Sequence, residues 1–178
     1  IDIPLTVGGG IASVQDIQDA LDAGASKVGI NSAAVKNPDF INEAVGKFGS
    51  DAVTIAVDMA YDEAKGDYFV YTNAGQTQID INALEWCKEC EERGAGALLI
   101  TSIDTDGAYT GFDIPFLKLA SETVSIPIIA SGGASGIQDF IDLFQQTILE
   151  AGLAASIFHK GEVAIEDLKA ALIAEGID

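Results

Sequence analysis

Residues 126–139 read IPIIASGGASGIQD, and residues 3–16 read IPLTVGGGIASVQD. Each stretch starts as an apolar, β-branched run, passes through glycines and continues into a segment with helical periodicity. The two copies lie 123 residues apart, so that Gly10 corresponds to Gly133. The repeat predicts an internal duplication of a strand–loop–helix unit.

The same alternation of strand and helix patterns continues along the chain. Strands are expected at 3–7, 27–30, 53–57, 97–101, 126–130 and 153–157. Helices are expected at 13–23, 38–48, 82–93, 114–122, 137–149 and 164–174. Six strand–helix units in a row predict an α/β fold with a parallel sheet, either doubly wound or a (βα)-barrel. A complete barrel has eight strand–helix units and about 250 residues. The pattern of this chain therefore predicts a barrel with six of the eight units.

A single domain over residues 1–178 is expected, with one insertion. The polar segment at about 61–78, YDEAKGDYFVYTNAGQTQ, follows the third strand and predicts a hairpin. Long loops of this kind often cover a site.

The composition limits the classes of function. The formal net charge is −19, with only nine Lys and Arg, which disfavours nucleic acid and anionic membranes as partners. No apolar run approaches the roughly 18 residues of a membrane span, and a cytoplasmic protein is expected. Cys87 and Cys90 lie one turn apart on an expected helix, and His159 is the only histidine. A buried apolar pair is therefore favoured over a metal or redox site, and no cofactor is expected.

Glycines follow the first and fifth expected strands, where parallel folds place their sites. Glycine lets the backbone approach an anion, and the following helix offers N–H groups, so each copy predicts a phosphate cradle. A pair of ordinary tight turns is the alternative. Small polar residues end the next strands, Asn31-Ser32 in one half and Ala155-Ser156 in the other. Two matched cradles suit a ligand with a phosphate at each end.

Carboxylates also follow the strands. Asp58 ends VTIAVD, a position that predicts general acid/base work, with a loop-anchoring role as the alternative. The stretch TSIDTDG at 101–107 supplies Asp104 and Asp106, which are either catalytic or shape an Asx turn.

The chain resembles the cyclase subunit of imidazole glycerol phosphate synthase, an enzyme of histidine biosynthesis. The motifs VGGGI, KVGINSAAVKNP, AVD, RGAGALLITSIDTDG, IIASGGA and LAASIFH occur in the order and spacing of that family, from about residue 3 to the end. The resemblance implies a barrel of two similar halves. It implies a lyase that uses ammonia to convert a bis-phosphate ribulosyl-formimino aminoimidazole carboxamide nucleotide into imidazole glycerol phosphate and aminoimidazole carboxamide nucleotide.

The resemblance also implies the site residues. Asp58 matches one of two essential aspartates. The phosphate sites and the mouth between them match Gly10, Asn31, Ser32, Thr101, Asp106, Gly107, Ser131, Gly133, Ala155 and Ser156.

Departures from the family pattern leave alternatives open. The family's first two units and its first-strand aspartate have no counterpart here, so a non-catalytic, phosphate-binding partial barrel is one alternative. The related isomerase of the same pathway is another. The family's glutaminase partner is implied, but Ala97 stands where the family usually has a Glu at the ammonia entrance. Unpaired sheet edges predict a homo-oligomer.

Overall fold

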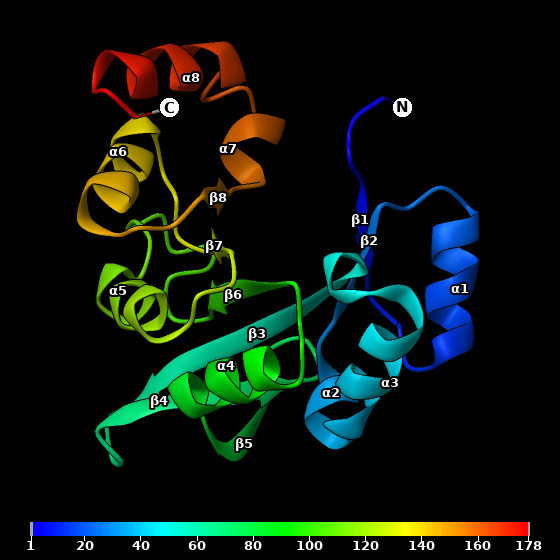
Figure 1. Ribbon diagram of the computed structural model, residues 1–178. Helices are drawn as coiled ribbons and strands as arrows, with labels where there is room; N and C mark the ends of the chain where they lie inside the picture. Colours follow the sequence, from blue (N-terminus) through cyan, green and yellow to red (C-terminus); the bar gives the residue numbers. More distant parts are fainter. Residues whose placement is uncertain (1, 178) are drawn as a thin grey trace.

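The computed structural model describes residues 2–177, which form a curled parallel sheet with helices on its outer side (Figure 1). Six parallel strands follow one another in the order β1-β2-β3-β6-β7-β8. Their bounds are β1 Thr6–Gly8, β2 Lys27–Ile30, β3 Val53–Asp62, β6 Ala97–Ser102, β7 Ile128–Ser131 and β8 Ala151–Leu153. Sequential strands therefore stay neighbours throughout, which confirms the barrel topology over the doubly wound one.

Helices connect the strands and cover the sheet. They are α1 Val14–Asp22, α2 Ser32–Lys36, α3 Asp39–Phe48, α4 Ala83–Glu92, α5 Ile114–Thr123, α6 Ile137–Gln146, α7 Ser156–His159 and α8 Ile165–Ala174, with a 3-10 turn η1 at Ser50–Ala52. In Figure 1 the helices of the N-terminal units and those of the C-terminal units form two arms joined by β3 and β6. No helix within residues 2–177 has the length and hydropathy of a membrane span.

The core lies between the sheet and the helices. Along β3, Ile55 and Val57 are completely buried, whereas Ala56 and Asp58 are partly exposed. Successive side chains of a strand point to opposite faces, so the buried set faces the helices and the accessible set faces the inside of the curl. The concave face is therefore the surface that is open to a ligand.

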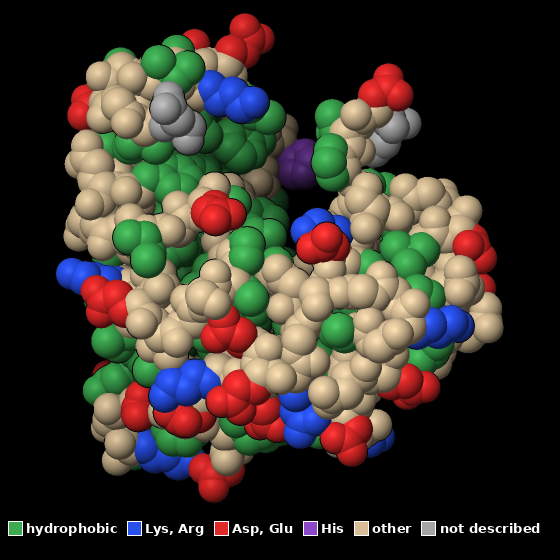
Figure 2. Space-filling model, viewed as in Figure 1, with side chains coloured by type: hydrophobic (Ala, Val, Ile, Leu, Met, Phe, Trp, Pro, Cys, Tyr) green, Lys and Arg blue, Asp and Glu red, His purple; other side chains and the backbone are tan. Residues whose placement is uncertain are grey.

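The sheet does not close into a cylinder within the described residues. There, β1 pairs only with β2, and β8 pairs only with β7. Figure 2 shows a notch between the two arms, with hydrophobic surface on the arm that carries α6 and α8. The structure is a partial (βα)-barrel of six units, as predicted.

One predicted strand was wrong. The expected strand at 153–157 ends at Leu153, and residues Ser156–His159 instead form α7. Ala151 pairs with Ile129 in the parallel ladder, so the strand lies earlier than its apolar pattern indicates. Periodicity cannot distinguish a short buried strand from a buried helical turn, and the run LAASIF fits both.

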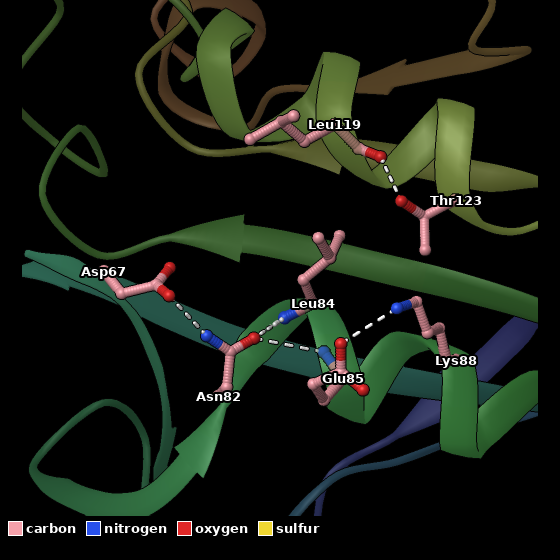
Figure 3. A network of polar contacts seen from close by, with 7 residues as sticks. All are labelled: Asp67, Asn82, Leu84, Glu85, Lys88, Leu119 and Thr123. Carbon is pink, nitrogen blue, oxygen red and sulfur yellow. Dashed lines mark hydrogen bonds and ion pairs between the residues drawn. The ribbon is translucent and has the colours of Figure 1, made fainter.

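The polar segment after the third strand forms two antiparallel strands, β4 (Asp67–Thr72) and β5 (Thr77–Asn82). They pair with an extension of β3 that continues past Asp58. Asn82 joins this hairpin to α4 (Figure 3): its Oδ1 accepts hydrogen bonds from the N–H groups of Leu84 and Glu85 at 2.9 and 3.1 Å, and its Nδ2 donates to Asp67 at 2.8 Å. The same view shows the Lys88–Glu85 ion pair on α4 and the Thr123 hydroxyl donating to the Leu119 carbonyl on α5.

Cys87 and Cys90 are both completely buried on α4, as predicted for an apolar pair. Burial raises the pKa of the Cys87 thiol to about 12 and also raises the pKa of Cys90. Neither thiol is a reactive thiolate at neutral pH.

Candidate active site

Three of the predicted site residues form one row across neighbouring strands, where the parallel pairing of β3, β6 and β7 nears its end. Asp58 on β3 is in register with Thr101 on β6, and Thr101 is in register with Ser131 on β7. Ser131 is in register with Leu153, the last residue of β8. Polar groups from three strands thus reach the same edge of the sheet, which is where βα-barrels carry their chemistry.

A cavity of about 1300 Å³ opens beside this row on the concave face. It is lined by four of the predicted residues, Gly10, Asn31, Ser32 and Asp58. The remaining predicted residues lie outside its lining, along the ends of β6, β7 and β8: Thr101, Asp106, Gly107, Ser131, Gly133, Ala155 and Ser156.

Asp58 is held by its neighbour on the next strand. The Asn31 Nδ2 donates a hydrogen bond to Asp58 Oδ2 at 2.9 Å. Burial raises the pKa of Asp58, the negative charge of Asp106 raises it further, and the hydrogen bond from Asn31 opposes both. The Asn31 Oδ1 is buried and has no hydrogen-bond partner among the described residues. Asp58 is therefore a carboxyl group whose environment favours holding a proton, as a general acid or base requires.

The aspartate of the repeated QD has the same structural role in both copies. Asp16 accepts hydrogen bonds from the backbone N–H groups of Ala12 and Ser13 at 3.0 and 2.8 Å. In the other copy Asp139 accepts from the N–H groups of Ser135 and Gly136 at 2.6 and 3.1 Å. The N-termini of α1 and α6 are thus capped by carboxylates of the chain itself. These contacts involve the N–H groups of each N-cap residue and of the residue before it, so the prediction that the first turn of each helix offers N–H groups to an anion stays a prediction.

The glycines before those helices are still open to a ligand in the first copy. Gly9 and Gly10 have φ of 90° and 76°, and a Cβ built on either would meet nothing within 4 Å. Positive φ suits glycine, and the free space leaves the backbone accessible from the cavity.

In the second copy the glycine loop packs against the loop after β6. The Gly111 N–H donates to the Gly133 carbonyl at 2.9 Å, and a Cβ on Gly133 would lie 2.0 Å from the Gly111 carbonyl oxygen. The Thr105 hydroxyl donates to the Gly132 carbonyl at 3.3 Å. These contacts fix the segment that carries Asp106 and Gly107 beside Gly132 and Gly133.

The same loop reaches the end of the last strand. Tyr109 has a φ of 57°, and its hydroxyl receives a hydrogen bond from Lys160 Nζ at 2.8 Å. Hydrogen bonds from Lys160 and then from Ser156 lower the pKa of Tyr109. The Lys160–Tyr109 contact therefore joins the end of α7, which begins at Ser156, to the loop that carries Asp106.

Asp104 anchors its loop through a long-range contact rather than through the predicted Asx turn. Its Oδ2 accepts a hydrogen bond from the Tyr61 N–H at 2.8 Å, which anchors the loop after β6 to the extension of β3. Sequence reasoning missed three residues that the structure places at the candidate site, namely Lys36, Tyr109 and Lys160. A signal for two of them was present, since Lys36 and Lys160 follow Ser32 and Ser156 at the same interval.

Comparison with known proteins agrees with this geometry. Residues 1–164 match the family described as "Histidine biosynthesis protein". The imidazole glycerol phosphate synthase subunit HisF of Lactiplantibacillus plantarum is 50% identical over 175 residues, which cover 98% of this chain and 69% of the relative. The HisF subunits of Staphylococcus carnosus and Halalkalibacterium halodurans are 49% and 47% identical, again over 69% of their lengths. The chain therefore belongs to the histidine biosynthesis protein family, among the HisF subunits of imidazole glycerol phosphate synthase.

Proposed function

We propose that this chain carries out the cyclase reaction implied by its motifs. In that reaction ammonia and a bis-phosphate ribulosyl-formimino aminoimidazole carboxamide nucleotide give imidazole glycerol phosphate and aminoimidazole carboxamide nucleotide. The observation that carries the proposal is the environment of Asp58, which lines a 1300 Å³ cavity and is hydrogen-bonded by Asn31. The HisF names of the relatives favour this reaction over the isomerase alternative.

Asp58 has the properties of a proton carrier for this chemistry. Ammonia must lose a proton after it forms a bond to carbon, and the bond that breaks must gain one. Burial raises the pKa of Asp58, so the carboxyl group exchanges protons more readily near neutral pH than an exposed aspartate does. Asp106 is the carboxylate whose charge acts on Asp58, and we assign to it the second proton-transfer role.

The two phosphates are assigned to the two halves. The first site uses Gly10, Asn31 and Ser32 at the cavity. The second uses the backbone of Gly107 and Gly133 with Ser156, where the loops after β6 and β7 meet the end of β8. Thr101 and Ser131 lie between these sites, in register with Asp58, and are assigned to hydroxyl groups of the sugar.

The test is ammonia-dependent turnover of the nucleotide substrate by this chain and by Asp58→Asn. We expect product formation by the parent chain and a decrease of roughly 10²–10⁴-fold in kcat for the variant, because general acid/base catalysis contributes about that much. Asp104→Asn is the matched control, since its carboxylate anchors a loop, and we expect a much smaller decrease.

Turnover that survives in Asp58→Asn would contradict the assignment of Asp58. If neither protein turns over substrate, and inorganic phosphate still raises the melting temperature, the non-catalytic phosphate-binding alternative holds. Phosphate binding in that case would be lost in Ser32→Ala or Ser156→Ala.

We also propose two kinds of partner chain, an ammonia-supplying subunit and a second copy of this chain. The relatives are named as subunits of a synthase, which supports an assembly with a second, ammonia-supplying chain such as a glutaminase. The unpaired edges of β1 and β8 support self-association. A cytoplasmic location stays a prediction from the composition.

A further inference from the structure

Two lysines occupy equivalent positions in the two halves of the chain. Lys36 follows Ser32 by four residues, and Lys160 follows Ser156 by four residues. The two serines are 124 residues apart, and so are the two lysines. The chain has only nine Lys and Arg residues against 28 Asp and Glu residues. Two lysines at matched positions beside the two proposed phosphate sites are therefore unusual for this composition.

The four-residue spacing places each lysine on the same helical face as its serine. Residues four apart lie on the same face of a helix, and the Cα–Cβ bond tilts toward the N-terminus. On α2 this places Lys36 and Ser32 on one face, and both line the 1300 Å³ cavity together with Asp58. Glu43 also lines that cavity, and its carboxylate would compete with a phosphate for Lys36.

In the second half the ammonium group is held by direct contacts. Lys160 Nζ donates to the Tyr109 hydroxyl at 2.8 Å and lies 5.0 Å from the centroid of the same ring. The Ser156 side chain, after Lys160, also lowers the pKa of Tyr109. Glu162 is 3.9 Å from Lys160 Nζ and is the carboxylate that faces it. The Tyr109 phenol thus holds the Lys160 ammonium group against the loop after β6.

The overall negative charge of the chain explains why a cation is needed beside each phosphate site. A protein with a formal charge of −19 repels a ligand that carries two phosphates. Backbone N–H groups and hydroxyls orient a phosphate but carry no net charge. One cation beside each site offsets the repulsion where the phosphate binds.

We propose that Lys36 and Lys160 are equivalent anion-binding residues, one for each phosphate of the substrate, with Tyr109 holding Lys160 in place before the phosphate arrives. The inference rests on the proposed function, because the two phosphate sites are those of the proposed substrate. It adds the charged component that the glycine loops and serines lack.

Titration with inorganic phosphate tests the pair, with amide NMR signals of Ser32 and Ser156 reporting on each site separately. Lys36→Gln should raise the phosphate Kd at Ser32 by roughly fivefold and leave the Kd at Ser156 unchanged, since a unit charge about 4 Å away contributes about 1 kcal/mol in water. Lys160→Gln should do the reverse. Both effects should shrink as salt is added, because exposed charges are screened.

Lys118→Gln is the matched control, since Lys118 is exposed on α5 and its substitution changes the net charge by the same amount. If all three variants raise the Kd values equally, only the overall charge matters and the pairing is overturned. Kd values that do not change in Lys36→Gln and Lys160→Gln also overturn it, while the phosphate sites stand. Absence of saturable shifts at both serines in the parent chain instead overturns the phosphate sites of the proposed function, and the inference with them.

Discussion

The burial of Asp58 suits proton transfer but lowers the stability of the folded protein at neutral pH. Its side chain is partly buried in β3, where the parallel pairing with β6 nears its end, and burial raises the pKa of its carboxyl group above the ordinary value of 3.8. The folded protein therefore holds this proton more tightly than the unfolded chain does. Stability linked to Asp58 is complete below about pH 3.8 and is lost as the pH rises through the folded-state pKa.

Asp58→Asn should consequently stabilise the protein at pH 7. The amide carries no charge to bury, so we expect the melting temperature to rise by a few degrees, where about 1 kcal/mol corresponds to about 2–4 °C in a chain of this length. The difference between the two proteins should disappear as the pH approaches 3.8, where Asp58 is itself neutral. Thermal unfolding of both proteins at a series of pH values measures this, and a gain that does not depend on pH would contradict it.

The hairpin after β3 depends on one residue at its junction with α4. Asn82 caps α4 through Oδ1 and holds Asp67 through Nδ2, so it links β5, β4 and the helix. The Tyr68 hydroxyl on β4 adds a second link by donating to Asp113 at 3.1 Å, and the Ser102 hydroxyl donates to the same carboxylate at 3.1 Å. These contacts fix the insertion against the loop that carries the candidate site.

Asn82→Ala should lower the free energy of unfolding by about 1–2 kcal/mol, since an N-cap is typically worth about that much. Urea denaturation measures the change. Asn82→Asp separates the two roles, because it keeps the capping oxygen and places a second carboxylate beside Asp67. If the cap dominates, the Asp variant should be nearly as stable as the parent chain, whereas equal losses in both variants would show that the Asp67 contact matters more.

The two ends of the sheet are the main feature at the scale of the whole molecule. Leu5, just before β1, and Leu153, at the end of β8, keep 41% and 42% of their surface exposed. The end strands have unpaired backbone groups along one side, a surface that pairs readily with another strand. The acidic charge opposes such contacts over long range, but salt screens it within about 8 Å at physiological ionic strength.

We expect the chain to self-associate at micromolar concentration, and more strongly as salt is raised. Light scattering at two salt concentrations gives the mass directly. Leu153→Lys should shift the population toward the monomer, because it places a charge at the end of an edge strand, whereas Leu119→Lys on exposed α5 should not. A monomer under every condition would contradict the prediction of a homo-oligomer.

Several features could be predicted from the sequence because they follow from local patterns. The alternation of apolar runs with helical segments determined the class of fold, and the buried pair Cys87 and Cys90 followed from helical spacing. The repeat of glycines identified two loops that follow strands, and the apolar run before Asp58 identified a strand that pairs in parallel with β6. Each of these depends on residues that are near one another in the chain.

Other features were decided only by the tertiary structure, since they depend on which distant groups meet. The last strand ends early because Ala151, not a later residue, meets Ile129. Tyr109 reaches Lys160 from a loop 51 residues away, and no local pattern records that contact. The sequence by itself determined the units and their polar ends, whereas packing between the units decided which of those ends face one another.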